Sequence, residues 1–232
     1  MAEKASPLCL QTFDFTTLYT KLNLDDLRER MKSLIVKVFD YKFDKDRCRA
    51  LLVEKSALHF DFMWLKHKNI DIDNERKRFT KVVDKDDILS WLDFFLDNLY
   101  IGIGDSLYKQ AIGIPMGTTC VVFLVNFYLF TYELDFMECL VSMDTCPIFL
   151  HKLCNVRRFI DDLFVPDIPS FSEFMYINQS SLGGGIYPKE FCELNCTSNS
   201  ACCAFLDLKI FQTPLGLEVD IMINGFNVNI LT

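Results

Sequence analysis

Two adjacent acids stand in an otherwise apolar segment, Phe159-Ile160-Asp161-Asp162-Leu163-Phe164. Burying an unpaired carboxylate is costly, and the tip of a β-hairpin would let two carboxylates reach solvent between apolar strands. A third acid, Asp14, ends the apolar segment at residues 8–15, which is typical of a strand. If these strands are neighbours, three carboxylates converge and repel one another unless cations occupy the site. Hard divalent cations with oxygen ligands suit such a cluster.

The chemistry that this set of residues predicts is phosphoryl transfer. Two Mg²⁺ ions about 4 Å apart, or Mn²⁺ in their place, would stabilise both the attacking and the leaving oxygen. Their expected ligands are Asp14, Asp161 and Asp162. Taken singly, an Asp-Asp pair is more often a turn or a helix cap, and an Asp after a strand is usually a turn residue.

Helices are expected to pack against the sheet that these strands form. Apolar spacing predicts helices over 24–39, 86–98 and 118–143. Asn23 is the expected N-cap of the first helix, and Asp86 or Asp87 that of the second. The first helix should bury one stripe, formed by Leu24, Leu27, Met31, Leu34, Ile35 and Val38. In the second helix, Trp91, Phe94 and Phe95 should point inward.

The third predicted helix begins in the longest apolar run, residues 118–132. This run is short for a membrane span and contains Asn126, so a buried helix is favoured over a membrane-associated segment. We therefore expect no membrane partner. The chain starts with Met1-Ala-Glu-Lys, which does not resemble a secretory signal and favours an intracellular protein.

Turn signals organise the rest of the chain. Residues 99–112 read as a β-hairpin turning at Gly104-Asp105-Ser106, and residues 180–185 as a flexible glycine-rich loop. Segments 204–211 and 215–223 read as strands. Residues 40–87 are the most polar region and are interpreted as a solvated insertion, with a basic contact loop for phosphates at residues 67–79 as the alternative.

Composition limits the classes of protein. Half of the 232 residues are apolar and 22 are Phe, which argues for a well-buried core and against disorder. The net charge of −8 is unlike that of a free-standing nucleic-acid binder. The ten cysteines form no CxxC pair and are interpreted as reduced thiols. Whether Cys192, Cys196 and Cys202 bind a metal stays open.

Four segments in order resemble the motifs of reverse transcriptases. Residues 13–20, FDFTTLYT, resemble the first catalytic motif, and residues 110–118, QAIGIPMGT, the glycine-proline motif that follows it. Residues 158–163, RFIDDL, resemble the aromatic-x-Asp-Asp motif, and residues 204–208, AFLDL, a downstream segment. The wording of the second and fourth segments is most similar to Penelope-like retroelements, over roughly residues 8–225.

This resemblance implies an α+β polymerase palm: an antiparallel sheet that bears the catalytic carboxylates, with helices packed on one face. It also implies an RNA-directed DNA polymerase that extends a primer on an RNA or DNA template with deoxynucleoside triphosphates. Asp14 and Asp161 would bind the metals directly, and Asp162 would support them. The chain would then be one partial palm domain, residues 1–232, with the polar insertion at 40–87. Fingers and thumb would be largely missing, and both are expected to be needed for gripping nucleic acid.

The resemblance also assigns substrate-binding residues. The backbone around Phe15 and Thr16 would face the triphosphate. Tyr19 would lie under the incoming sugar and exclude a 2′-hydroxyl. The floor beneath the nascent base pair would be formed by Gly113, Pro115, Met116 and Gly117.

The chain departs from the family in two places. Met116 stands where many reverse transcriptases carry Gln. Thr118-Thr119-Cys120-Val121-Val122 replaces the expected Asn and the Cys-Ala-Pro step. These departures motivate the alternative that the chain is a catalytically inactive retroelement-derived fragment, which acts as a binding module or has no function.

Overall fold

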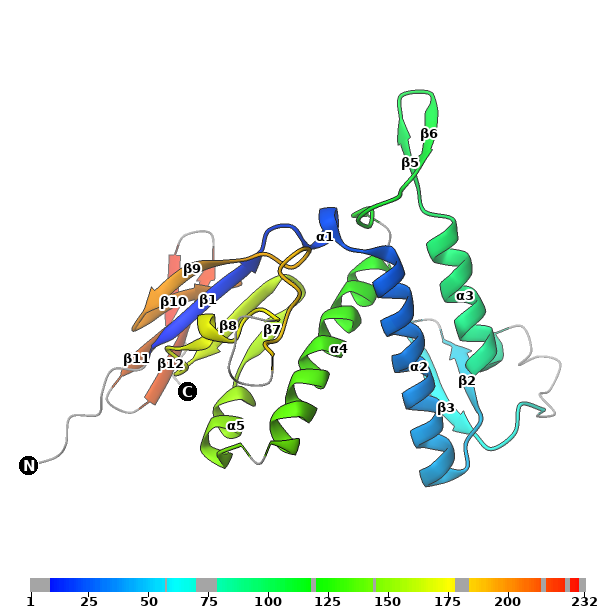
Figure 1. The fold of residues 1–232 in the computed structure, drawn as a ribbon, viewed down its shortest axis with the longest axis horizontal. Coiled ribbons are helices and arrows are strands. Elements are labelled where there is room, and N and C mark those ends of the chain that lie inside the picture. The colour runs from blue at the N-terminus through cyan, green and yellow to red at the C-terminus, as the bar shows by residue number, and fades with distance from the viewer. Residues whose placement is uncertain are drawn as a thin grey trace, which may run out of the picture. The chain divides into compact units, whose positions relative to one another are not determined.

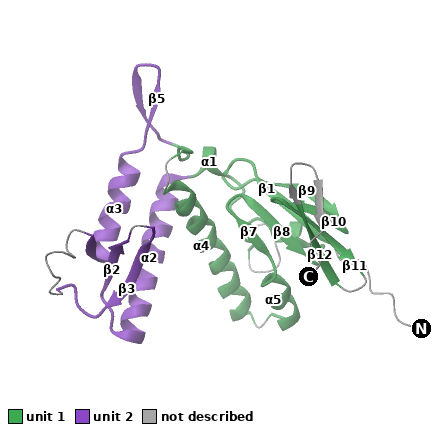
Figure 2. Ribbon diagram, turned by 180° about the vertical axis from the view of Figure 1, so that it is seen from behind, with its two compact units in different colours: residues 1–22, 112–232 green, residues 23–111 purple. Residues whose placement is uncertain are grey.

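The computed structural model describes residues 9–56, 58–69, 79–117, 120–143, 145–177, 184–213, 216–223 and 226–229. Helices combine with antiparallel sheets, as the sequence predicted. The chain forms two compact units (Figure 2). Unit 1 comprises residues 1–22 and 112–232, and unit 2 comprises residues 23–111.

A four-stranded antiparallel sheet is the centre of unit 1. Its order is β7-β8-β1-β9, so that the N-terminal strand lies between two strands from much later in the chain (Figure 1). The strands are β1 (Leu10–Phe15), β7 (Arg157–Phe159), β8 (Asp162–Pro166) and β9 (Leu194–Ser200). The expected strand at 8–15 and the hairpin around the acid pair are both confirmed. Strand β9 was missed because Leu-Asn-Cys-Thr-Ser-Asn-Ser lacks apolar alternation.

Alternation along β1 gives this sheet two different faces. Phe13 and Phe15 point into an aromatic core. The ring centre of Phe13 lies 5.3 Å from that of Phe171, and the ring centre of Phe15 lies 5.0 Å from that of Tyr187. Leu10 belongs to a separate apolar cluster with Phe164, which contacts the second sheet of the unit. Asp14 lies four residues after Leu10 on the same strand, so the two side chains point to the same face. This face is opposite the aromatic core.

The second sheet of unit 1 has the order β10-β11-β12-β13. Its strands are β10 (Cys202–Phe205), β11 (Leu208–Thr213), β12 (Gly216–Ile223) and β13 (Phe226–Asn229). The single strand expected at 204–211 is wrong, because the chain turns at Leu206-Asp207, where Leu206 has a φ of 56°. The strand expected at 215–223 is β12, although Leu215 lies outside the described residues.

Helix α4 (Val121–Ser142) and helix α5 (Pro147–Leu153) belong to unit 1, as does the short helix α1 (Leu18–Lys21). A 3-10 turn, η2, spans Phe171–Glu173. The prediction that α4 is a buried helix holds for one face only: Val125, Tyr128 and Leu129 are buried, but Phe123 and Phe127 are exposed. Across the described part of the chain, every helix falls short of the length and apolar character that crossing a membrane requires.

Unit 2 is built on a sheet of its own. Strands β2 (Ala50–Lys55), β3 (Phe60–Leu65) and β4 (Thr80–Asp84) form it, and helices α2 (Leu24–Asp46) and α3 (Lys85–Asp97) accompany it. Of the three long helices expected to pack on the carboxylate sheet, α2 and α3 belong to unit 2, whereas the sheet belongs to unit 1. The three strands lie within the region interpreted as a solvated insertion, where interleaved charges hid their pattern.

The expected hairpin that follows α3 is confirmed. It consists of β5 (Tyr100–Ile103) and β6 (Ser106–Lys109), and turns at Gly104-Asp105. Gly104 has a φ of 59°, which glycine adopts without the steric cost that a side chain would bring.

The helix caps of unit 2 test the local predictions. The side chain of Asn23 accepts hydrogen bonds from the N–H groups of Asp25 and Asp26, as expected. The N-cap of α3 is Asp84, not Asp86 or Asp87, and Asp87 completes a capping box with it.

The predicted buried faces of the two helices are wrong in part. In α2, Val38 is exposed and Phe39 takes its place in the core. In α3, the buried positions are Leu92 and Leu96, whereas Phe94 is 71% exposed and Trp91 49% exposed. The aromatic character of Trp91 and Phe94 therefore did not indicate burial.

Candidate active site

The register of unit 1 brings two of the three candidate carboxylates face to face. Asp14 on β1 lies directly opposite Asp162 on β8 in the antiparallel ladder. Side chains in such cross-strand positions have Cβ atoms about 5 Å apart, and like charges placed so destabilise the sheet. The fold therefore retains a repulsive pair at the end of a ladder in which every other residue is uncharged.

Asp161 occupies the turn next to this pair. The β7–β8 hairpin pairs Phe159 with Asp162, so that Ile160 and Asp161 form its two-residue turn. The N–H of Phe15 donates to the carbonyl oxygen of Asp161 over 3.1 Å. This bond extends the β1–β8 ladder into the turn and fixes the backbone of the third acid beside the other two.

The turn itself is strained. Ile160 has a φ of 57°, in the left-handed region that β-branched residues avoid. Such a conformation costs about 1–3 kcal/mol and persists only where the surrounding structure enforces it. Strain of this kind often occurs at functional sites.

The charges of the three acids affect one another. The pKa of Asp14 is raised by burial and then by the charge of Asp161. The pKa of Asp162 is raised by burial and then by the charges of Asp161 and Asp14. The three groups thus interact electrostatically and favour a nearby cation.

The side chains do not, however, converge on a single point. Within the described ranges, no three His, Cys, Asp or Glu side chains are arranged so that they could hold a metal ion. This statement also covers Cys192, Cys196 and Cys202, all of which are free thiols.

Tyr19 on α1 lies close enough to this site to sense its charge. The pKa of its hydroxyl is raised by burial and then by Asp161. Its carbonyl oxygen accepts a hydrogen bond of 2.8 Å from the N–H of Ile114. The first and second resemblance segments are therefore joined through their backbones.

Gly113 explains how the two segments approach so closely. Its N–H donates to the carbonyl oxygen of Leu22 over 2.8 Å, and its φ is 75°. A Cβ at this position would lie 2.5 Å from the carbonyl oxygen of Tyr19 and 2.7 Å from that of Thr20. Only a glycine therefore fits at this position, and the role of Gly113 beneath a nascent base pair stays a prediction.

The rest of the glycine-proline segment is more open. Pro115 is half-buried, and Met116 is 72% exposed, followed by an exposed Gly117. Residues 118–119 lie outside the described part of the chain.

The backbone N–H groups of Phe15 and Thr16 both donate hydrogen bonds within the protein. The Phe15 side chain is buried, and its N–H is bonded to Asp161. The N–H of Thr16 donates to the carbonyl oxygen of Glu193 over 3.0 Å. These two N–H groups are therefore already used as donors.

A functional candidate that the sequence prediction missed is Arg158. Its side chain is 8% exposed and pairs with Glu133 of α4, with a distance of 2.5 Å between Nε and Oε1. The available signal was a charged residue directly before the apolar hairpin, next to the acid pair. The sequence prediction rested on the two acids of this motif and gave Arg158 no role.

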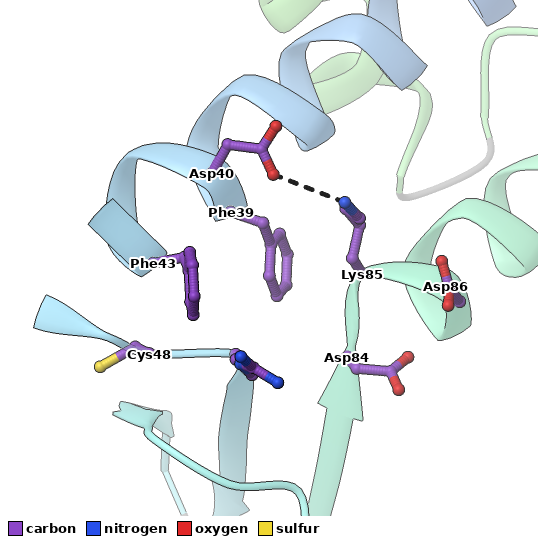
Figure 3. A pocket seen from close by; sticks show the side chains of 8 residues that line it. Phe39, Asp40, Phe43, Cys48, Asp84, Lys85 and Asp86 are labelled. Atoms are coloured by element: carbon purple, nitrogen blue, oxygen red, sulfur yellow. Dashed lines mark hydrogen bonds and ion pairs between the residues drawn. The ribbon is translucent and has the colours of Figure 1, made fainter. Parts of the chain in front are cut away.

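Unit 2 contains a separate cavity of about 350 Å³ (Figure 3). Phe39 and Phe43 of α2 contribute to its wall, and Asp40 pairs with Lys85 across it at 3.5 Å. None of the three candidate carboxylates belongs to unit 2, so this cavity is not part of the site.

Lys68, the first lysine of the basic contact loop considered at residues 67–79, is already paired. Hydrogen bonds to Asp84 and then to Asp87 raise the pKa of Lys68 to about 12. Lys68 therefore serves the cap of α3, and residues 70–78 of the loop lie outside the described ranges.

Solved structures with the same fold were found by comparison. Telomerase from Candida albicans, in complex with a TWJ fragment of telomeric RNA, matches with a TM-score of 0.51 and 17% identity over 92% of this chain and 31% of that chain. Apo telomerase from Candida tropicalis matches with a TM-score of 0.56 and 14% identity over 95% and 33%. The chain thus has a fold like that of telomerase, a reverse-transcriptase-like enzyme, and spans about a third of those chains. No protein-family model and no curated protein sequence matches.

Proposed function

We propose that this chain is the palm of an RNA-directed DNA polymerase and transfers deoxynucleotides to a primer 3′-hydroxyl. The observation that supports this most is the register of Asp14 opposite Asp162, with Asp161 tied by its backbone to the same strand. A ladder that holds like charges together suits a site that binds cations. The order of the four sequence segments favours a reverse transcriptase, and the wording of the second and fourth favours a Penelope-like one.

Asp14 and Asp161 would hold two Mg²⁺ ions, or Mn²⁺ in their place, and Asp162 would support them. The pKa values of Asp14 and Asp162 are raised by burial first and by the neighbouring acids second, and a bound cation would favour the charged carboxylates against both effects. Since the described side chains do not converge on one point, binding requires rotation of the carboxylates about their side-chain bonds. Such ions, when bound, activate the primer hydroxyl and stabilise the charge on the leaving pyrophosphate.

The chain's own residues would shape the substrate site around these acids. Gly113 brings the glycine-proline segment against α1, and Pro115, Met116 and Gly117 continue from there as a floor for the nascent base pair. The exposed surface of Thr16 borders the position proposed for the triphosphate, and Phe15 supports it from the core. One telomerase of similar fold was solved with RNA, which supports an RNA template as the partner.

Primer extension tests this proposal. A DNA primer annealed to an RNA template, with all four deoxynucleoside triphosphates and Mg²⁺ or Mn²⁺, should give extended products that EDTA abolishes. Low salt and high protein concentration are needed, because phosphate contacts supply most non-specific affinity and this chain is acidic. Products that persist in EDTA, or no products with either metal, would contradict the proposal.

Tyr19 supplies a test of sugar selection. Replacing Tyr19 with Ala should lower the preference for deoxynucleotides over ribonucleotides by at least about tenfold, because the ring no longer obstructs a 2′-hydroxyl. Tyr19→Phe keeps the ring and should keep the preference. The measurement is the ratio of kcat/KM for dATP and ATP on one template, and an unchanged ratio in the alanine variant would remove Tyr19 from the sugar site.

A second candidate is a catalytically inactive fragment that binds a partner or has no function. The lack of three converging ligands among the described residues favours it. Thermal unfolding with increasing Mg²⁺ separates the two candidates. A functional site should show metal-dependent stabilisation, whereas an inactive fragment should show none.

A further inference from the structure

Arg158 is fully bonded within unit 1. Its guanidinium group has five N–H donors, and five contacts account for them. Nε and Nη2 donate to the two carboxylate oxygens of Glu133, over 2.5 and 3.1 Å. Nη1 donates to the side-chain oxygen of Asn126 and, over 3.3 Å, to the carbonyl oxygen of Ile160. Nη2 also donates to the carbonyl oxygen of Asn126 over 3.1 Å.

These contacts connect the hairpin to α4. Arg158 lies on β7, Asn126 and Glu133 lie two helical turns apart on α4, and Ile160 is in the turn that carries Asp161. The guanidinium group therefore joins the helix to the backbone immediately before a candidate metal ligand.

The counter-ion is held in place as well. The hydroxyl of the buried Tyr187 donates to Oε1 of Glu133 over 2.8 Å. A cavity of about 140 Å³ borders the pair, and apolar side chains such as Leu163, Phe171 and Ile186 line much of it. Burial is the largest single influence on the pKa of Arg158 and lowers it, but the hydrogen bonds and charges of Glu133 and Tyr187 together outweigh burial and raise the pKa.

The strained turn needs such a support. Ile160 is held at a φ of 57°, and its carbonyl oxygen is one of the acceptors of Arg158. Relaxation of this residue would swing the turn and move Asp161 relative to Asp14. A lysine could not replace the arginine, because three donors on one nitrogen cannot bridge a carboxylate, an amide and a carbonyl in one plane.

We propose that Arg158 is a positioning residue, which anchors the hairpin turn to α4 through Glu133 and so fixes Asp161 and Asp162 for metal binding. The inference rests on the proposed function, since it concerns the same metal-binding carboxylates. It adds a residue that contacts neither metal nor substrate.

Three variants test this role. Arg158→Met leaves the half-buried Glu133 carboxylate without its arginine partner, and is expected to lose stability. The double variant Arg158→Met/Glu133→Gln removes both charges while Gln keeps an acceptor for Tyr187, and is expected to recover much of that stability. Arg157→Met is the matched control, because the exposed Arg157 side chain donates to the carbonyl oxygens of Cys154 and Val156 and not to Glu133.

The readout is Mn²⁺ affinity of the folded protein, measured by electron paramagnetic resonance, together with the Mn²⁺ concentration that gives half-maximal primer extension. The double variant should bind Mn²⁺ about 10–100-fold more weakly than the wild type, the usual effect of losing a supporting group around a metal site. Arg157→Met should bind as the wild type does.

Two contrary outcomes differ in what they reject. If the stabilised double variant binds Mn²⁺ as tightly as the wild type, Arg158 is a purely structural residue and the inference is wrong, while the proposed function stands. The second outcome is that the wild type binds no Mn²⁺, or binds only Mn²⁺ that Asp161→Asn also binds. In that case the metal-dependent function is rejected, and the positioning role with it.

Discussion

Replacing Asp161 with Asn should lower metal-dependent primer extension by more than about 100-fold, beyond the range typical of losing a supporting group around a metal. The substitution keeps the shape of the side chain and removes its charge. The hydrogen bond from Phe15 to the backbone carbonyl of residue 161 does not depend on the side chain, so the turn should persist. The loss should therefore appear in kcat and in the metal requirement, with folding intact.

The same variant should be at least as stable as the wild type without metal. The charge of Asp161 raises the pKa of both Asp14 and Asp162, and its removal relieves that repulsion. Because these carboxyl pKa values are raised in the folded protein, the repulsion costs stability above the unfolded pKa, near 3.8, and disappears as the groups become protonated below it. The stability gain of Asp161→Asn should thus be present at neutral pH and absent in strong acid.

Asp207→Asn is a suitable control for both measurements. Asp207 also follows a residue with positive φ in a two-residue hairpin turn, since Leu206 has a φ of 56°. It shares the local geometry of Asp161, but Leu208 follows it where Asp162, the partner of Asp14, follows Asp161. Primer extension by Asp161→Asn at the wild-type rate would reject the metal assignment.

The second large effect is expected at Gly185, where alanine should destabilise the protein far more than alanine at Gly184. The two glycines have nearly the same backbone angle, with φ values of 83° and 88°. The strain of a side chain there is about 1–2 kcal/mol at either position. A Cβ at Gly184 meets open space, whereas one at Gly185 would lie 1.8 Å from the carbonyl oxygen of Tyr176.

The backbone around Tyr176 cannot easily move away. Ile177 donates to the carbonyl oxygen of Tyr187, and Tyr187 donates to that of Met175, each over 2.9 Å. Displacing this segment would shift the buried Tyr187, which holds Glu133. Overpacking adds about 1–3 kcal/mol or more to the strain, so urea unfolding should place Gly185→Ala about 3 kcal/mol below Gly184→Ala. Equal stabilities would contradict the close contact.

Local patterns predicted those parts of the fold that local physics decides. The N-cap at Asn23, the hairpin turn at Gly104 and the strand that carries Asp14 all follow from residue preferences over a few positions. The contact of Gly113 with the backbone of Tyr19 and Thr20 was not predicted, because it joins segments about 90 residues apart.

Other features depend on partners far away in the sequence. The polar strand β9 forms only because β1 offers a ladder to pair with. Phe94 is exposed because the core side of α3 falls at Leu92 and Leu96, and only the position of the neighbouring sheet decides this. The role of Arg158 depends on Glu133 and Tyr187, 25 and 29 residues away along the chain, which no spacing rule connects.

The central position of β1 also sets the order in which the chain can fold. Its partners in the sheet, β8 and β9, begin at Asp162 and Leu194, so during synthesis β1 emerges from the ribosome long before either of them. The strands of unit 2 pair with one another within residues 50–84, and such local contacts form quickly. Unit 2 is therefore expected to fold before β1 has a partner strand. Until β8 and β9 are synthesised, β1 is unpaired and prone to association with other chains. The strand that carries Asp14 is made before its partners β8 and β9, and its sheet is completed only after β9 has been synthesised.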